Sequence, residues 1–571
     1  DMEYTVGADA QPQQVMAGQT LHATVNIMTN ISSTVSVKAD FIDLQTGESV
    51  YTKVAPNQAL TAGVSTPVTL TMDLPKYIDN NQTNFVLDGQ YAIRVELYNG
   101  DMSVLIKTEE QAGTFQVVSP EIVPAPEPTQ PSKLPDYFAI GAAADRDIYG
   151  ITGWMKDTGL PWNFAYHYLN GGVNTSENWK NWEWYNTGGF NGGYAYDYAK
   201  KAIAQGYTPV FDYYQMLQSY LPECGTSCDE NVKDLKSLND PKLMRSYFED
   251  FKLLMQLMGT GNYNGHQGIG KPVIVHVDPD LAGYAQQAVL DNNRCSGFCT
   301  GQGNNPSYLK AAVNTTRMPE LAVLPNTYQG YNWALLHLRD LYAPNVILAP
   351  HVNSWGTLQD VGTSTDPTLD VVALGHLAAE FANQNGVRDV PAGIKPYDLI
   401  FNDVADRDAE YIPRYWWDQY NVTFPNFHRW ESFISTVHQD TNKEILLWQV
   451  PLGNQYFRTM TIPKYDEKGE LNPQKKNHYM DNKVEYFFNH LDELVNCGIV
   501  GMMVGYGEIQ QTAQFDFAKD GVVNGPEIET NLGVSSGTIR IWRESTSSDD
   551  DGGYLRMKAG EYFQNPLPLQ R

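Results

Sequence analysis

From about residue 136 to the end of the chain, short apolar runs alternate with segments that have the apolar spacing of a helix. This alternation is the feature that most constrains the fold. Short apolar runs bounded by turn residues are typical of strands buried on both faces, which occur mainly in parallel sheets. Eight runs have this character, at residues 137–140, 162–168, 208–214, 273–277, 346–349, 399–401, 444–448 and 499–504.

The segments between several of these runs are amphipathic. Residues 241–258 place Leu243, Tyr247, Phe251, Leu254 and Met258 on one helix face. We expect similar helices at residues 328–341, 369–383, 426–437 and 482–495, and a last outer helix at residues 554–563. Strands and helices in alternation predict a (β/α)8 TIM barrel, and the length beyond roughly 250 residues predicts long βα loops.

The first part of the chain has a different period. Residues 1–118 contain runs of alternating apolar and polar residues at 20–28, 35–42, 66–72, 91–97 and 113–118. Period-two alternation predicts half-buried strands, here an immunoglobulin-like β-sandwich that is a spacer or, less favoured, a glycan-binding module. Residues 119–135 contain six prolines and are expected to form a stiff linker. The predicted domains are therefore 1–118 and 136–571, joined by 119–135.

The net charge of −27 limits the partners of the chain. A surface this negative repels nucleic acid and anionic membranes, and it also disfavours a strongly acidic polysaccharide as ligand. The sequence contains no run of 18 apolar residues, so it predicts no transmembrane helix. The sequence leaves the oligomeric state open.

Four of the five cysteines form two C-x3-C pairs, Cys224 with Cys228 and Cys295 with Cys299. Two disulfides that staple loops are favoured, while a zinc site or free thiols stay open. Cys497 is expected to be a buried free thiol. Disulfides, together with a chain start at Asp1-Met-Glu that looks processed, predict a secreted or cell-surface protein.

Polar and aromatic residues follow the carboxyl end of nearly every predicted strand, which is where a barrel of this kind builds its ligand cleft. Residues expected to bind a substrate there are Tyr166, His167, Asn170, Asp212, Tyr214, Gln215, His276, His351, Asn353, Trp355, Trp448, Gln449 and Glu508.

Carboxylates are concentrated after the fourth and sixth predicted strands. Asp278 and Asp280 follow the fourth, although such residues can also simply cap a helix. Asp403, Asp406 and Asp408 follow the sixth. Glycoside cleavage needs one carboxyl group as acid and a second as base or nucleophile. We therefore expect the acid at Asp278 or Asp280 and the base at Asp403, Asp406 or Asp408.

Residues 136–571 resemble secreted TIM-barrel glycoside hydrolases in architecture, over about three quarters of the chain. The resemblance implies cleavage of a polysaccharide, and the net negative charge favours a neutral one, expected to be a plant or microbial glucan-type chain. In retaining members with this fold, a Glu ends the fourth strand and a nucleophilic Glu ends the seventh. Here the fourth ends in Asp278 and the seventh in Trp448-Gln449, so an inverting mechanism is favoured.

Two other functions stay open: a glycan-binding or cell-surface protein without catalysis, and a structural component of an extracellular filament. No cofactor is expected. A metal held by His276, His351 and Asp278 is less favoured than ligand or backbone contacts. Structural Ca²⁺ is possible at the acidic segments 516–524 and 549–551, although neither has the EF-hand spacing.

Overall fold

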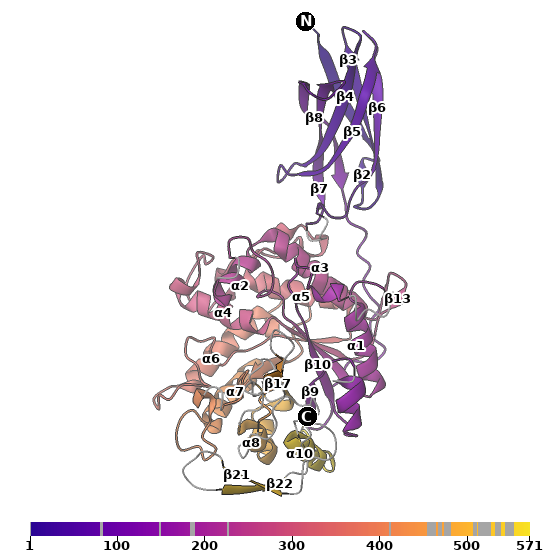
Figure 1. The fold of residues 1–571 in the computed structure, drawn as a ribbon. Coiled ribbons are helices and arrows are strands. Elements are labelled where there is room, and N and C mark those ends of the chain that lie inside the picture. Colours follow the sequence, from indigo (N-terminus) through magenta and orange to yellow (C-terminus); the bar gives the residue numbers. More distant parts are fainter. Residues whose placement is uncertain are drawn as a thin grey trace. The chain divides into compact units, whose positions relative to one another are not determined.

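The computed structural model describes residues 2–79, 84–147, 150–182, 189–224, 228–409, 413–453, 464–465, 471–472, 481–505, 511, 527–531, 538–542 and 553–570. The chain divides into two compact units (Figure 1). One consists of Asp1–Val123 with Pro241–Ser246 and Val313–Leu324, and the other of Pro124–Asp240, Tyr247–Ala312 and Pro325–Arg571. The division at Val123 falls inside the predicted linker.

The second unit is built on eight parallel strands. They are β9 (Ala139–Ala143), β10 (Phe164–Leu169), β11 (Thr208–Tyr213), β14 (Val273–Val277), β15 (Val346–Ala349), β16 (Ile400–Asp403), β17 (Ile445–Val450) and β20 (Ile499–Val504). Their order in the sheet is β15-β14-β11-β10-β9-β20-β17-β16. Each strand therefore lies next to its neighbours in sequence, and β20 returns to β9.

A contact just beyond β15 joins the two ends of this order. His351 forms a parallel β-bridge with Phe401 of β16. The Phe401 amide donates to the carbonyl of Pro350 and the Val352 amide donates to the carbonyl of Phe401, both at 3.0 Å. The eight strands thus form the ring of a (β/α)8 barrel, as the alternation of runs predicted.

Helices follow the strands and lie around the outside of the ring (Figure 1). They are α1 (Gly193–Ala204), α2 (Glu230–Leu238), α3 (Pro241–Met258), α4 (Pro279–Leu290), α5 (Tyr328–Tyr342), α6 (Val371–Ala382), α7 (Phe427–Thr441), α8 (Lys483–Asn489), α9 (Leu491–Asn496) and α10 (Gly553–Phe563). The helix expected at residues 482–495 is two helices, because the backbone of His490 is not helical (φ −135°, ψ 37°). Three small two-stranded sheets complete the unit: β12–β13 (Asn262–Tyr263, His266–Gln267), β18–β19 (Lys464–Tyr465, Leu471–Asn472) and β21–β22 (Glu527–Asn531, Thr538–Trp542).

Inward-facing side chains fill the ring, so it is a packed core and not a channel. The buried cluster includes Phe164, Val210, Ile274, Phe401 and Leu446 from five different strands. Gly141 of β9 leaves room for Phe164, since a β-carbon at position 141 would collide with it. The packed interior holds the strands rigidly and leaves only their carboxyl ends to form a site.

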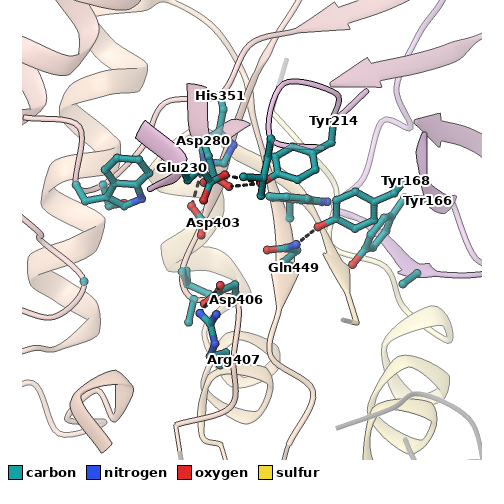
Figure 2. Close-up of a pocket in the computed structure, with 18 of the residues that line it drawn as sticks. Tyr166, Tyr168, Tyr214, Glu230, Asp280, His351, Asp403, Asp406, Arg407 and Gln449 are labelled. Carbon is teal, nitrogen blue, oxygen red and sulfur yellow. Dashed lines mark hydrogen bonds and ion pairs between the residues drawn. The ribbon is translucent and has the colours of Figure 1, made fainter. Parts of the chain in front are cut away.

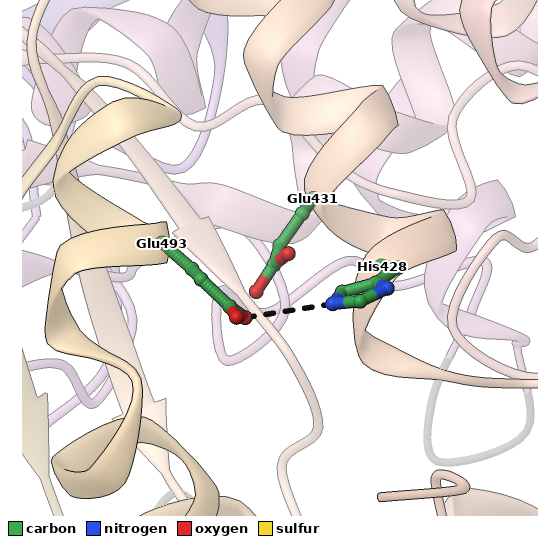
Figure 3. Close-up of side chains that lie close together, drawn as sticks. All are labelled: His428, Glu431 and Glu493. Atoms are coloured by element: carbon green, nitrogen blue, oxygen red, sulfur yellow. Dashed lines mark ion pairs between the residues drawn. The ribbon is translucent and has the colours of Figure 1, made fainter. Parts of the chain in front are cut away.

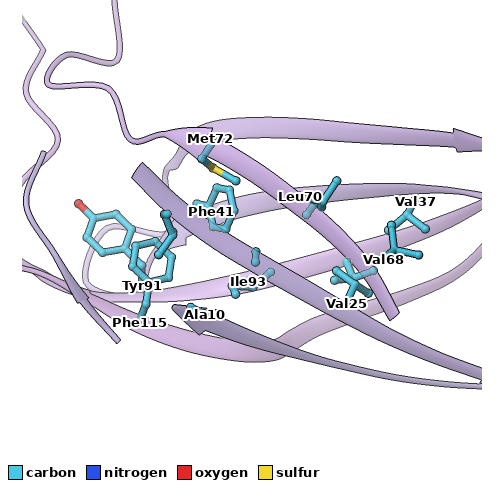
Figure 4. Close-up of a cluster of buried hydrophobic side chains, with 14 of the residues drawn as sticks. Ala10, Val25, Val37, Phe41, Val68, Leu70, Met72, Tyr91, Ile93 and Phe115 are labelled. Atoms are coloured by element: carbon cyan, nitrogen blue, oxygen red, sulfur yellow. The ribbon is translucent and has the colours of Figure 1, made fainter. Parts of the chain in front are cut away.

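The first unit contains two sheets around one core. The smaller has the order β1-β3-β6 (Tyr4–Gln11, Thr20–Thr29, Thr66–Asp73), and the larger β2-β8-β7-β4-β5 (Gln14–Val15, Leu105–Val117, Gly89–Asn99, Ser33–Asp43, Ser49–Leu60). Val25 and Leu70 of the first sheet pack with Phe41, Ile93 and Phe115 of the second (Figure 4). Three strands of this unit, β1, β2 and β5, have no counterpart among the predicted runs. The immunoglobulin-like assignment stays a prediction.

Both C-x3-C pairs are disulfides. Cys224 bonds to Cys228 and Cys295 to Cys299, with Cα–Cα distances of 5.0 and 5.8 Å. Cys497 is a buried free thiol, as expected. Within the described parts of the chain, no helix combines the length and apolar character that a membrane crossing requires.

Candidate active site

A cavity of about 730 Å³ lies at the carboxyl ends of the barrel strands (Figure 2). Residues that end or follow β9, β10, β11, β14, β15, β16 and β17 line it. Its acidic side chains are Glu230, Asp280, Asp360, Asp403 and Asp406. The cavity is therefore where barrel enzymes place their chemistry, and it is strongly acidic.

On one side of the cavity, the Tyr214 hydroxyl joins two carboxyl groups. Its oxygen is 2.6 Å from Glu230 Oε1 and 3.1 Å from Asp280 Oδ2 (Figure 2). A phenol has one hydrogen, so it can donate to only one of the two oxygens. The hydroxyl oxygen can also accept a hydrogen bond, so both contacts are hydrogen bonds when one of the two carboxyl groups is protonated and donates to it. The geometry therefore fits one protonated and one ionised carboxyl group.

The pKa of Asp280 indicates where that proton stays. Burial, and then the charges of Glu230 and Asp403, raise the pKa of Asp280 well above its usual range, while the Tyr214 hydrogen bond lowers it. Desolvation and like charges both disfavour the ionised form of a carboxyl group. Asp280 is therefore the group of this pair that retains a proton.

Beside this pair, Asp403 ends a row of four hydrogen-bonded groups (Figure 2). Asp212 Oδ1 is 2.7 Å from His276 Nδ1, His276 Nε2 is 3.0 Å from His351 Nδ1, and His351 Nε2 is 3.0 Å from Asp403 Oδ1. Asp212 and His276 are fully buried. The ring of Phe401 stacks on His276 at 4.2 Å, and Trp448 packs against it edge-on. We call these four residues the Asp212–Asp403 row.

Neutral imidazoles allow two proton arrangements in this row, because each ring donates at one nitrogen and accepts at the other. In one, Asp212 is protonated and every donor points toward an ionised Asp403. In the other, every donor points toward Asp212, and Asp403 holds the proton. Burial raises the pKa of Asp212 well above its usual range. Burial and the neighbouring His351 lower the pKa of His276 well below its usual range. Both directions favour the arrangement in which Asp212 holds the proton and the donors point toward Asp403.

The Asp212–Asp403 row depends on strand register. Asp212 of β11 pairs directly with His276 of β14, and His351 follows β15, the next strand. Trp448 of β17 reaches across the ring and donates from Nε1 to Asp212 Oδ2 at 3.0 Å. All ring nitrogens of His276 and His351 are occupied by this row. The alternative in which these histidines and Asp278 hold a metal does not fit this geometry.

Asp278 does not line the cavity. Its backbone has φ +27°, which turns the carboxyl group away from the site. Oδ1 accepts from the amides of Gln215 and Met216 at 3.0 and 3.1 Å, and Oδ2 accepts from the Tyr247 hydroxyl at 2.5 Å. Burial raises the pKa of Asp278 to about 6. Asp278 therefore stabilises the segment after β11 through hydrogen bonds. Its role is structural, and of the two predicted acids only Asp280 lines the cavity.

The other carboxyl groups after β16 also differ in position. Asp406 lines the cavity and forms an ion pair with Arg407 at 2.5 Å. Asp408 is fully buried outside the cavity lining and accepts from the Gly453 amide at 3.3 Å. Asp403 is therefore the carboxyl group of this strand end that faces the cavity without an arginine partner in contact.

The end of β17 is irregular. The pairing of β17 with β20 shifts register between Leu447 and Val450, and Gln449 has φ +52°. This bulge places both Trp448 and Gln449 in the cavity lining, and the Gln449 amide donates to the Tyr168 hydroxyl. The seventh strand thus presents a carboxamide where retaining enzymes of the resembled class carry a carboxylate.

Aromatic side chains form much of the wall. Those in the lining are Tyr166, Tyr168, Trp182, Tyr214, Tyr284, Trp355, Tyr415, Trp417 and Trp448. Trp355 packs on Tyr284 with ring centroids 4.9 Å apart. Flat indole and phenol faces suit the C–H faces of sugar rings, and their hydroxyl and N–H groups supply hydrogen bonds.

The remaining predicted site residues divide into three groups. Tyr166, His167, Asn170, Tyr214, His351, Trp355, Trp448 and Gln449 line the cavity. Asp212, Gln215, His276 and Asn353 lie behind the lining and support it. Glu508 lies outside the described residues. His167 is held by Tyr194 at 2.9 Å and Asp145 at 3.5 Å.

Sequence reasoning missed Glu230, Asp360 and Arg407, all of which line the cavity. Glu230 is the first residue of α2. Asp360 lies in the segment after β15, and its carboxyl group accepts from the Gly362 amide and the Thr363 hydroxyl. Neither directly follows a strand, so the strand-end rule does not select them. An acidic residue in the first turn of a helix is a signal, but a common one.

No family model matches the chain, and no curated protein matches it in sequence. Among solved structures, beta-glucuronidase 2 of Bacteroides uniformis, covalently bound to cyclophellitol-6-carboxylate aziridine, is 9% identical with TM-score 0.29, over 90% of this chain and 47% of that chain. The beta-glucuronidase of Parabacteroides merdae with glycerol in its active site is 10% identical with TM-score 0.25, over 88% and 47%.

A beta-glucosidase of Listeria innocua in complex with glucose is 18% identical with TM-score 0.15, over 21% of this chain and 16% of that chain. This chain spans about half the length of the two beta-glucuronidases. TM-scores this low carry no argument about fold or activity. The barrel assignment rests on the strand pairing, and the function on the site.

Proposed function

We propose that this protein is a glycoside hydrolase that cleaves a neutral polysaccharide, with Asp280 as general acid and Asp403 as general base. One observation carries the proposal. Two carboxyl groups line the same cavity in different surroundings: burial and neighbouring acids raise the pKa of Asp280, whereas Asp403 is hydrogen-bonded to His351. Such a divergence is how one site supplies both an acid and a base at the same pH.

In the proposed reaction, the Asp280 carboxyl group gives its proton to the glycosidic oxygen as the bond from that oxygen to the anomeric carbon breaks. A water molecule attacks the anomeric carbon, and Asp403 takes a proton from that water. The products are a free hydroxyl on the leaving sugar and a hemiacetal on the other. One proton leaves Asp280 and one arrives at Asp403, so exchange with solvent restores both groups.

The Asp212–Asp403 row supports the second half of this reaction. In this row His351 donates to Asp403 and holds the carboxylate in place. The proton that Asp403 takes from water stays on Asp403 until solvent removes it, so Asp212 keeps its own proton and no proton passes to a histidine. No charge then accumulates on a histidine in the buried interior, where an unpaired charge is costly. Asp212, His276 and His351 act through Asp403 and are positioning residues.

Inversion is favoured over retention because of the residues at the seventh strand end. Trp448 and Gln449 offer no carboxylate that could form a covalent glycosyl intermediate. The base is instead on the sixth strand, where it is placed to activate water.

The cavity lining favours a neutral substrate. Among the described residues of the lining, five acidic side chains accompany one arginine, Arg407, which is paired with Asp406. An anionic sugar would be repelled by this lining. The two disulfides favour an oxidising location, so we propose a secreted or cell-surface enzyme. Its first unit is proposed to be an immunoglobulin-like spacer, with 119–135 as linker to a catalytic domain at 136–571.

Reducing-sugar release from neutral glucans, mannans and xylans tests the proposal, using Asp403→Asn beside the wild type. We expect the variant to lose activity by about 10²–10⁴-fold, the usual contribution of a general base. Asp389→Asn is the control, because Asp389 is an exposed partner of Arg388 outside the cavity lining. Full activity of Asp403→Asn would refute the assignment, and glycan binding without turnover by the wild type would favour a binding protein. Proton NMR of the first product distinguishes inversion from retention of the anomeric configuration.

A further inference from the structure

A second group of titratable side chains lies on the outer helices. His428 and Glu431 are three residues apart on α7, and Glu493 lies on α9. One potential ligand atom from each of these three residues lies within 4.8 Å of the others. Figure 3 shows the three side chains converging on one point between the two helices. None of the three lines the cavity at the strand ends.

Glu431 is the unusual member. Glu431 is only 7% exposed, and its Oε1 has no hydrogen-bond partner among the described residues. Burial, and then the charges of Glu493 and Asp492, raise the pKa of Glu431 to about 7. A buried carboxylate beside another carboxylate is unfavourable unless a proton or a cation compensates the charge.

The rest of the group is held in place by its neighbours. Glu493 Oε2 accepts from the Tyr486 hydroxyl at 3.0 Å, and that hydroxyl accepts from the Asn421 amide at 3.1 Å. Asn421 Oδ1 accepts from the backbone amide of His428 at 3.0 Å. His428 Nε2 lies 3.6 Å from Glu493 Oε2. Such contacts fix the direction of ligand side chains around an ion.

We propose that His428, Glu431 and Glu493 bind one divalent cation of the first transition row, with Zn²⁺ as the representative ion. One imidazole and two carboxylates are a donor set that suits such ions, and they supply a charge of −2. Ligand atoms that each lie about 2.0–2.2 Å from one ion are separated from one another by no more than twice that distance. The three ligand atoms here lie within 4.8 Å of one another, so only small side-chain movements are needed. Binding would give the buried oxygen of Glu431 a partner.

Cys497 is not counted among the ligands. Its sulfur is not among the ligand atoms that lie within 4.8 Å of one another. The proposed site therefore has an N/O/O donor set, and it joins α7 to α9 at the outside of the barrel.

Isothermal calorimetry with ZnCl₂ tests the proposal on the full chain after treatment with a chelator. We expect one site of high affinity in the wild type, and a rise in Tm on addition of Zn²⁺. Glu431→Gln keeps the shape of the side chain, and we expect it to weaken binding at least about tenfold and to remove the Tm shift. His428→Ala is expected to do the same, and Ca²⁺ is expected to bind more weakly because it prefers oxygen ligands alone.

His376→Ala is the matched control. His376 pairs with Asp440 on the outer surface at 2.5 Å, so it is also an exposed histidine beside a carboxylate, but the described residues add no buried third ligand there. This variant should bind Zn²⁺ as the wild type does. Absence of Zn²⁺ binding by the wild type, or unchanged affinity in Glu431→Gln, would overturn the proposal. Loss of binding in His376→Ala, with Glu431→Gln unaffected, would place the ion elsewhere.

Discussion

The ends of β14 and β16 both carry acidic residues, and each divides them between cavity and scaffold. After β14, Asp280 enters the cavity while Asp278 is buried against the segment after β11. After β16, Asp403 enters the cavity while Asp408 is buried. The two cavity residues then differ from each other in their neighbours. Asp280 faces other acids and a phenol, whereas Asp403 faces an imidazole. Residue type and strand position alone therefore do not determine which carboxyl group is acid, base or structural.

The largest effect should separate Asp280 from Asp278, which are two residues apart. We expect Asp280→Asn to lower kcat/KM by about 10²–10⁴-fold, because it removes the proton donated to the leaving oxygen. Asp278→Asn should keep activity of the same order as the wild type, since its amide oxygen can still accept from Gln215 and Met216. Steady-state kinetics on a cleaved polysaccharide measures both. Equal losses of kcat/KM in the two variants would contradict a catalytic role for Asp280 and a structural role for Asp278.

Asp278 should instead govern stability. Asp278→Ala leaves two buried amides without their acceptor, which we expect to cost about 2–4 kcal/mol in the free energy of unfolding. The pKa of the folded carboxyl group is about 6, above its usual value of 3.8. Its contribution to stability is therefore present at low pH and is lost as the pH rises toward 6, by roughly 2–3 kcal/mol. Urea unfolding at several pH values should show this decline in the wild type and a weaker decline in Asp278→Asn.

The surroundings of Asp280 can be changed from two sides with opposite results. The charge of Glu230 raises the pKa of Asp280, and the Tyr214 hydrogen bond lowers it. Glu230→Gln should therefore move the basic limb of the pH–rate profile to lower pH, and Tyr214→Phe should move it to higher pH. Each variant should also lose roughly 10- to 100-fold in kcat, as is usual for residues that orient a catalytic group. Shifts in the same direction would contradict Asp280 as the acid.

Much of the barrel follows from local sequence, because buried parallel strands are short and nearly all apolar. The bounds of β14, β15 and β20 agree with the apolar runs at 273–277, 346–349 and 499–504. The strand-end rule then finds Asp280, His351 and Asp403. It succeeds because parallel strands bring all their carboxyl ends to one face.

The fate of Asp278 and the Asp212–Asp403 row could not be predicted in this way. The direction of the Asp278 carboxyl group depends on a backbone angle, φ +27°, and a positive φ can be predicted from residue type only for glycine. The row depends on the register of β11 with β14, which places Asp212 beside His276. Single-strand patterns contain no register, so both features require the assembled sheet.

The smallest effect concerns Asp212, and it tests whether Asp212 holds the proton of the row. An asparagine at position 212 can accept from Trp448 Nε1 through its oxygen and donate to His276 Nδ1 through its nitrogen, so it mimics only protonated Asp212. Every donor in the row then points toward Asp403, as in the arrangement favoured for the wild type. Asp212→Asn should therefore leave the acidic limb of the pH–rate profile in place. The plateau should fall no more than about tenfold, the lower end of what is typical for residues that orient a catalytic group. An acidic limb that moves, or a plateau that falls much further, would show that Asp212 does not hold the proton of the row in the wild type.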